Sequence, residues 1–261
     1  MKHGSDNKMY NNDCKNLEII AREIEAGEDL FVFRVFDEKS HRWTRLVANS
    51  RKELEKPAEL FEFSLNPLCD IADEMVIRKK LADIQEIHQG NIRLKATIEV
   101  LRPKLNLIVF GAGHVGQAVA LIGAILGYDV VLIDDRAEFA TRKRVPDSRV
   151  QLIVGNYSEA IKGVKIGSNS AIVIVTRGHQ YDEVCLRSVI RSQASYLGMI
   201  GSKRRVVSVM NRLKGDGFSE SDFRKVHAPI GLHIGAKSPQ EIAVAIHAEI
   251  VEHFNLNNHQ Y

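Results

Sequence analysis

The chain has 261 residues, enough for one large domain or two ordinary ones. Apolar residues account for 44% of it and charged residues for 26%, which excludes a grossly disordered chain, and the net charge of +3 is too small to indicate a nucleic-acid partner. It has no run of about 18 apolar residues for a membrane span, no apolar signal-peptide core, and no Cys-x-x-Cys pair among Cys14, Cys69 and Cys185. We therefore expect a cytoplasmic protein without a membrane partner or a structural metal.

The first hundred residues predict a small α+β module. Apolar residues at helical spacing indicate a helix over 15–25, and the run 30–36 is expected to pair with 42–48 as a hairpin, because turn residues lie between them. A second helix is predicted over 70–88, ended by a glycine. Residues 92–100 alternate between apolar and polar, as in a strand with one wet face.

Beyond residue 103 the pattern changes to alternating strands and helices. Apolar runs typical of strands covered on both faces lie at 105–110, 129–133, 150–154, 171–175 and 195–200. Helical segments are expected at 114–126, 157–163, 181–192, 202–214 and from a capping box at Ser238 to about 254. This alternation predicts an α/β fold, a Rossmann-like doubly wound parallel sheet over 103–261, with the N-terminal α+β module over 1–102.

The predicted helix 114–126 contains no charged residue. A helix that is apolar all round is normally covered on both sides. We expect the sheet to cover one side, and either a second subunit or the N-terminal module to cover the other.

The sequence GAGHVG follows a predicted strand and opens this helix. In that context Gly111 permits a tight turn, Gly113 lets the backbone approach a pyrophosphate, and Gly116 allows the helix to pack closely on the strand. The helix amino terminus offers free N–H groups to an anion, and His114 in its first turn either contacts the ligand or makes a structural hydrogen bond. The alternative is a Rossmann scaffold whose pocket is vestigial or holds another ligand.

The next strand ends at Asp134, at the separation from the glycine loop where a carboxylate binds the ribose of a dinucleotide. An acidic residue here favours NAD over NADP, because it repels a 2′-phosphate, but Arg136 two positions later weakens that preference. Asp134 is otherwise a solvated residue at a strand end or a helix cap.

Two further polar motifs follow predicted strands, TRGHQYD at 176–182 and GMIGSKRR at 198–205. Because the carboxyl ends of parallel strands meet at one edge, we expect both motifs and the glycine loop to converge there. His179 and Asp182 are interpreted as an acid/base pair or metal ligands, the alternative being a helix cap beside a solvated imidazole.

The second of these motifs predicts an anion site. Ser202 is placed to cap the next helix, whose N–H groups suit an anion together with the three basic residues that follow, Lys203, Arg204 and Arg205. A solvated basic face is the alternative.

Five stretches of the sequence together resemble the XdhC/CoxI family, the accessory proteins of molybdenum hydroxylases such as xanthine dehydrogenase. They are IEVLRPKLNLIVFGAGHVGQAVA (98–120), VVLIDDRAEF (130–139), TRGHQYD (176–182), YLGMIGSKRR (196–205) and APIGLHIGAKSPQEIAVAIHAEI (228–250). The resemblance covers roughly 98–254, the family's C-terminal Rossmann domain. Longer members carry a glycine-rich GGC-E type motif in their N-terminal part, which this sequence lacks.

The resemblance implies a cofactor-binding chaperone rather than a catalyst. Such proteins bind molybdenum cofactor, a phosphorylated or nucleotide-extended pterin, while a cysteine desulfurase installs its sulfido ligand. They then deliver it to the apo-hydroxylase, and they tend to be homodimers. The matching cofactor-binding positions here are Gly111, Gly113, His114, Gly116, Asp134, Asp135, Arg136, Thr176, Arg177, Gly178, Gly201, Ser202, Lys203, Arg204 and Gly231, with His179 and Asp182 as candidate catalytic residues.

Two alternatives from other functional classes remain. An NAD(P)-dependent oxidoreductase would use His179 and Asp182 for proton transfer. A nucleotide-sensing regulatory domain would need only the glycine loop and the acidic strand end. The sequence has no G-x-S-x-G elbow, H-E-x-x-H or P-loop lysine, which excludes the common hydrolase and phosphotransferase classes.

Overall fold

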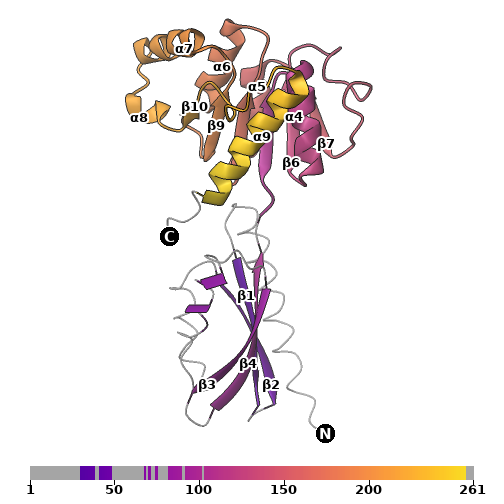
Figure 1. Ribbon diagram of the computed structural model, residues 1–261, viewed down its shortest axis with the longest axis vertical. Helices are drawn as coiled ribbons and strands as arrows, with labels where there is room; N and C mark the ends of the chain where they lie inside the picture. The colour runs from indigo at the N-terminus through magenta and orange to yellow at the C-terminus, as the bar shows by residue number, and fades with distance from the viewer. Residues whose placement is uncertain are drawn as a thin grey trace. The chain divides into compact units, whose positions relative to one another are not determined.

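The structure is a computed structural model that describes residues 30–38, 41–48, 68, 70–71, 74–75, 82–89, 92–101 and 103–256 (Figure 1). The chain divides into two compact units, Met1–Pro103 and Lys104–Tyr261. The helix predicted over 15–25 lies outside the described residues, as do Cys14 and Cys69. No helix in the described part of the chain is both long and apolar enough to cross a membrane.

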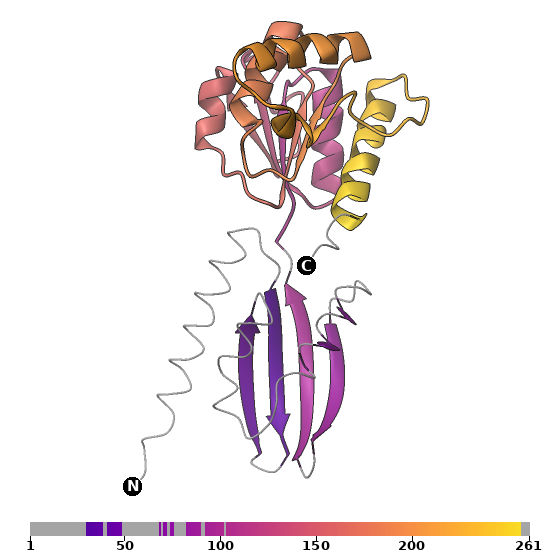
Figure 2. The ribbon, with the colours of Figure 1, turned by 90° about the vertical axis from the view of Figure 1, so that its left-hand side faces the viewer.

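The described part of the N-terminal unit contains a four-stranded antiparallel sheet in the order β2-β1-β4-β3 (Figure 2). The strands are β1 (Leu30–Asp37), β2 (Arg42–Ala48), β3 (Ala82–Gln89) and β4 (Ile92–Leu101). The predicted hairpin is confirmed, since β1 pairs with β2 from Phe31 opposite Ala48 to Asp37 opposite Arg42. Alternate residues such as Phe33 and Ile98 are buried together on one face, because successive side chains in a strand point to opposite faces.

The helix predicted over 70–88 is wrong in its second half, where the structure has β3. Gln89 pairs with Ile92 across the β3–β4 ladder, so only Gly90 and Asn91 separate the two strands. A Gly-Asn dipeptide between two such runs is itself a hairpin signal. It outweighs the helical spacing of the apolar residues, and it leaves Ile84 74% exposed on the face opposite the core.

The C-terminal unit contains a six-stranded sheet in the order β10-β9-β8-β5-β6-β7, and every neighbouring pair is parallel. The strands are β5 (Asn106–Phe110), β6 (Asp129–Asp134), β7 (Val150–Val154), β8 (Ser170–Ile174), β9 (Tyr196–Met199) and β10 (Val226–His227). Numbered within this unit, the order is 3-2-1-4-5-6, that of the doubly wound dinucleotide-binding fold. The predicted fold class is confirmed.

Helices cover both faces of this sheet (Figure 1). One face carries α4 (His114–Ile125) and α9 (Pro239–Leu256). The other carries α5 (Tyr157–Ala160), η2 (Ile161–Gly163), α6 (His179–Val189), α7 (Lys203–Gly215) and α8 (Glu220–Phe223).

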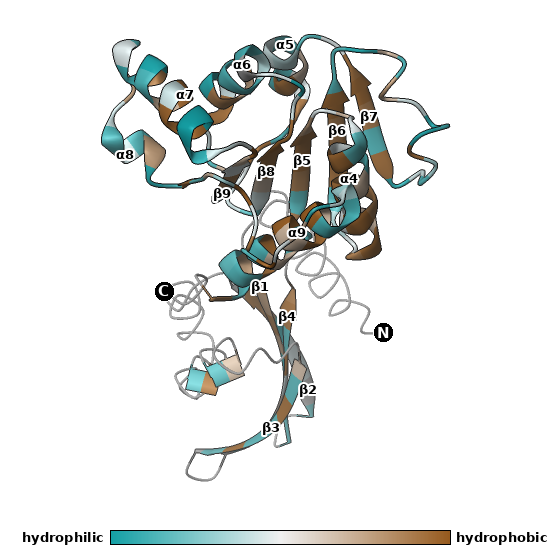
Figure 3. Ribbon diagram, turned by 45° about the horizontal axis from the view of Figure 1, so that its top comes forward, coloured by the Kyte–Doolittle hydropathy of each residue, from teal (hydrophilic) through white to brown (hydrophobic). Residues whose placement is uncertain are grey.

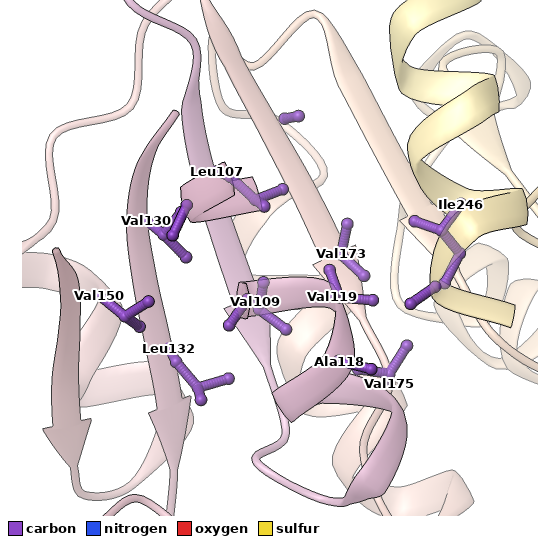
Figure 4. Close-up of a cluster of buried hydrophobic side chains, with 14 of the residues drawn as sticks. Leu107, Val109, Ala118, Val119, Val130, Leu132, Val150, Val173, Val175 and Ile246 are labelled. Atoms are coloured by element: carbon purple, nitrogen blue, oxygen red, sulfur yellow. The ribbon is translucent and has the colours of Figure 1, made fainter. Parts of the chain in front are cut away.

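The core explains why the strand runs are continuously apolar (Figure 3). In β5, Leu107 and Val109 pack under α4 and α9, whereas Ile108 and Phe110 pack under the helices of the opposite face. All four side chains are fully buried, and each contributes about 1.5–3 kcal/mol relative to exposure. Figure 4 shows Val109, Val119 and Ile246 among the side chains of the cluster under α4 and α9.

The uncharged helix α4 is covered on its second side by α9 of the same unit. This cover by a helix of the same unit was not predicted from the sequence. The Nε2 of His247 on α9 lies 2.8 Å from the carbonyl oxygen of Val119 on α4. Close packing on the sheet is secured at Gly123, where an added Cβ would lie 2.5 Å from the Leu107 side chain. This arrangement leaves Ile125, near the end of α4, exposed.

Candidate functional site

The site lies where the chain leaves adjacent strands for opposite faces. β5 leads to α4 on one face of the sheet, and its neighbour β8 leads to α6 on the other. Such a switch point opens a crevice beyond the carboxyl ends of the strands. The adjacent strands β6, β5, β8 and β9 place the sequence motifs there, at 134–136, 111–116, 176–182 and 201–205.

In the glycine loop after β5, two positions have no room for any side chain, and a third has free space beside it. Gly111 has φ +103°, and a Cβ there would lie 2.6 Å from the carbonyl oxygen of Val175. A Cβ on Gly116 would lie 1.7 Å from the carbonyl oxygen of Gly111, so the loop and helix pack too closely for any side chain. A Cβ on Gly113 would meet no atom within 4 Å. The space over Gly113 is therefore available to a ligand.

Two helices begin at this edge without a side-chain cap. Gly113 is the N-cap of α4 and Gly178 is the N-cap of α6, and neither helix start has a side-chain cap hydrogen bond. The first N–H groups of a helix need a partner and carry a partial positive charge. The two starts lie on opposite sides of the switch point, so both favour an anion in the crevice.

Asp134 is fully buried and holds the glycine loop in place. Its Oδ2 accepts hydrogen bonds from the Ala112 N–H at 2.6 Å and from Arg136 at 3.0 Å. Its Oδ1 accepts from the Arg136 backbone N–H at 3.0 Å and from Arg136 Nε at 2.9 Å. Burial raises the pKa of Asp134, but the bonds from Arg136 and Ala112 outweigh it and leave the pKa below its ordinary value.

The ribose contact predicted for Asp134 does not fit this geometry. A carboxylate offers about four acceptor positions, and those of Asp134 are used by the loop and by Arg136. Arg136 is itself stacked 3.6 Å over the ring of Phe139. Asp134 therefore positions the loop, and the partly exposed carboxylate at this strand end is that of Asp135.

Asp135 joins the end of β6 to the start of α6. Its Oδ2 accepts a hydrogen bond from Arg177 at 2.9 Å, and its Oδ1 lies 3.4 Å from the hydroxyl of buried Tyr157. Arg177 also lies 4.3 Å from the centroid of the Tyr181 ring and donates to its hydroxyl. Sequence reasoning missed both tyrosines, although Tyr181 belongs to the TRGHQYD motif.

Asp182 forms a buried ion pair instead of facing the crevice. Its side chain is completely buried, accepts a hydrogen bond from Thr176 Oγ1 at 2.5 Å and pairs with Arg205. This cluster ties the loop after β8 to the first turn of α7. Asp182 is thus a positioning residue, the side chain of His179 lies outside the described residues, and proton transfer by His179 stays a prediction.

The start of α7 is capped, unlike those of α4 and α6. The Oγ of Ser202 accepts from the Arg205 N–H at 3.3 Å. Lys203 and Arg204 in the first turn are exposed, and Gly201 before them has φ +153° with the Arg205 stem packed against it. Two of the three predicted basic residues are thus free to attract an anion, whereas Arg205 neutralises Asp182.

Gly231 lies in a second anchored loop that reaches α9. Its N–H donates to Glu249 Oε2 at 2.7 Å, and the same carboxylate accepts from Tyr196 at 2.6 Å and lies 3.2 Å from His227 Nδ1. A Cβ on Gly231 would lie 3.2 Å from the backbone nitrogen of Ile246. Gly231 is thus held by packing and by Glu249, and the structure gives it no free N–H for a ligand.

His114 lines a cavity of about 240 Å³ on the outer side of α4. The cavity is lined by His114, Gln117, Ala118, Leu121, Ile122, Arg144 and Gln240.

Among the described residues, no group of three or more His, Cys, Asp or Glu is arranged to hold a metal ion.

Residues 107–250, more than half of the chain, match the family model of the XdhC Rossmann domain. The chain belongs to this family. It is 31% identical over 155 residues to a protein of Bacillus subtilis strain 168 described as a probable xanthine dehydrogenase subunit, covering 59% of this chain and 44% of that protein. It is 22% identical over 149 residues to the molybdenum cofactor insertion chaperone PaoD of Escherichia coli K12, covering 57% and 40%.

The XdhC Rossmann domain accounts for only part of the curated relatives, since the matches span 29 to 44% of their lengths. A crystal structure described as a xanthine dehydrogenase of Bacillus halodurans is similar to 94% of this chain and 68% of that one, with a TM-score of 0.63. At 20% sequence identity this likeness shows a shared fold.

Proposed function

We propose that this XdhC-family chain is an accessory protein of a molybdenum hydroxylase such as xanthine dehydrogenase, and that it binds molybdenum cofactor at the switch point. The observation that carries the proposal is the pair of uncapped helix starts at Gly113 and Gly178, with open space over Gly113. The names of two relatives, a molybdenum cofactor insertion chaperone and a probable xanthine dehydrogenase subunit, support the same role.

The chemistry of the site suits a phosphorylated pterin. A phosphoryl group needs several N–H donors and a positive field, which the helix starts of α4 and α6 and the exposed Lys203 and Arg204 supply. Asp134 keeps the glycine loop in the required shape without placing its own charge in the crevice. The residues present therefore fit the phosphate end of molybdenum cofactor.

In this role the chain binds and protects a cofactor and does no chemistry on it. The terminal sulfido ligand would be installed by a cysteine desulfurase, and an apo-hydroxylase would accept the finished cofactor. We extend the proposal to a homodimer, for which the exposed Ile125 and Leu126 at the end of the uncharged helix α4 give apolar contacts.

Dinucleotide binding is the second candidate. The 3-2-1-4-5-6 strand order and the GAGHVG loop are those of NAD(P)-binding domains, which fits an oxidoreductase or a nucleotide sensor. The engagement of Asp134 with Ala112 and Arg136 disfavours it, because the usual ribose contact is lost.

Calorimetric titration of the full chain with isolated molybdenum cofactor under anoxic conditions, and with NAD and NADP in parallel, distinguishes the candidates. We expect binding of molybdenum cofactor at micromolar concentration and weaker binding of both dinucleotides. Binding of NAD without binding of the pterin would replace the proposal by the second candidate. Binding of neither would overturn both.

A further inference from the structure

The ion pair between Asp135 and Arg177 joins the two strand ends on either side of β5, at the switch point. Asp135 follows β6 and Arg177 follows β8, and β5 lies between these two strands. Neighbouring strands are about 4.8 Å apart, so the two side chains must span two strand spacings to meet at 2.9 Å. They therefore bridge the carboxyl end of the strand that carries the glycine loop.

Arg177 is the cation closest in sequence to the uncapped start of α6. Its guanidinium rests 4.3 Å from the centroid of the Tyr181 ring, which fixes the side chain without neutralising it. The Arg177 and Asp135 side chains are 35% and 24% exposed, so the pair is open to solvent and to solutes. Ion pairs at such exposure are weak and are readily exchanged for another anion.

Asp135 has other partners if it loses Arg177. Its Oδ1 lies 3.8 Å from Arg136 Nε and 3.4 Å from the Tyr157 hydroxyl, whereas Arg177 is bound to its other oxygen, Oδ2. Releasing Arg177 therefore leaves the Asp135 carboxylate with a cation and a donor beside it.

We propose that Arg177 is a phosphate-binding side chain of the crevice and that Asp135 is its built-in competitor. Without a ligand, Asp135 holds Arg177 across the end of β5. An incoming phosphoryl group, which has more acceptor oxygens than a carboxylate and is also attracted by the α4 and α6 helix starts, takes Arg177 over. This inference rests on the proposed function and deepens it, because Asp135 then opposes ligand binding instead of contributing to it.

The competition has a consequence for specificity. A ligand must offer enough negative charge at the helix starts to displace a carboxylate, so phosphate esters and diphosphates bind and neutral pterins or nucleosides do not. Removing the Asp135 charge should strengthen the binding of phosphorylated ligands. Removal would weaken binding if Asp135 held a ribose hydroxyl or a pterin edge.

The test is a titration of full-length variants with isolated molybdenum cofactor and with inorganic pyrophosphate at one fixed ionic strength. We expect Asp135→Asn to bind both about fivefold more tightly, and Arg177→Gln to bind both at least about tenfold more weakly. In the double variant Asp135→Asn/Arg177→Gln the gain should disappear, because the competitor acts only through Arg177. Glu138→Gln, which removes an exposed carboxylate from the same turn, should change affinity less than about twofold.

Unchanged or weaker binding by Asp135→Asn, with normal binding by the wild type, would overturn the inference and leave the proposed function standing. Equal tightening by Glu138→Gln would also overturn it, because net charge would then explain the gain. Absence of binding by the wild type would overturn the proposed function itself. Thermal unfolding of each variant checks that the comparison is made on folded protein.

Discussion

Two glycine-containing loops of the C-terminal unit are each held by a buried or half-buried carboxylate, and they differ in what surrounds that carboxylate. Asp134 accepts from the Ala112 N–H and is paired with Arg136, which stays charged at every accessible pH. Glu249 accepts from the Gly231 N–H and is paired with His227 and Tyr196. The first loop carboxylate is paired with a guanidinium, and the second with an imidazole and a phenol hydroxyl.

The difference matches the surroundings of the two loops. Beside Asp134 lies open space over Gly113, where a ligand would need a loop of constant shape. Beside Glu249 the loop packs against α9, and a ring cluster of Tyr196, His227 and His253 fills the space. A carboxylate that accepts from a loop N–H thus fixes the shape of the glycine loop at Asp134, and at Glu249 it holds a loop against α9.

The largest loss of stability is expected from Asp134→Asn. The substitution leaves the Arg136 guanidinium without its buried counter-ion and weakens the bond to the Ala112 N–H, so we expect a loss of about 3 kcal/mol in the free energy of unfolding. Urea denaturation of the full chain followed by far-ultraviolet circular dichroism measures it. A loss below about 1 kcal/mol would contradict the role given to Asp134.

A smaller loss of stability is expected at acidic pH from His253, which lies in the ring cluster beside Glu249. Burial and the neighbouring His227 lower the pKa of His253, so below the unfolded-state value of 6.5 the unfolded chain binds the proton more readily than the folded chain. This contribution to stability is complete above pH 6.5 and is lost as the pH falls below it. The Asp134 contribution persists there, because a lowered aspartate pKa is felt only below the ordinary value of 3.8.

The histidine variant His253→Phe sharpens this comparison, because a phenyl ring keeps the contacts with Tyr196 and His227 but does not titrate. Between pH 7.5 and pH 5.5 the wild type should lose about 1 kcal/mol more stability than the variant. The measurement is the urea midpoint at each pH. Equal losses would show that His253 does not contribute to the pH dependence.

The two carboxylates also show how far the sequence predicts such a site. The apolar runs predicted all of β5 to β9, because burial on both faces dictates continuous apolar sequence. Spacing from the glycine loop singled out Asp134, but its role depends on the donors that surround it in three dimensions. Glu249 was not predicted, because its partners Tyr196 and His227 lie 53 and 22 residues away and share no local pattern with it.

The error over 70–88 has a related cause. Apolar residues at helical spacing and a two-residue hairpin signal compete in this segment, and the hairpin pairing of β3 with the next strand, β4, decides between them. The spacing of apolar residues alone therefore does not distinguish a helix from a hairpin here. The short Gly-Asn dipeptide was the decisive local signal.

The central claim is that the ligand lies on the glycine loop, and Gly113→Val tests it most directly. A Cβ at Gly113 would meet no atom within 4 Å, and the same holds at Gly163, the last residue of η2, which precedes the amino end of β8, so Gly163→Val is a matched control. Titrated calorimetrically with molybdenum cofactor, Gly113→Val should bind at least about tenfold more weakly than wild type, and Gly163→Val should bind normally. Normal binding by a folded Gly113→Val variant would contradict the account.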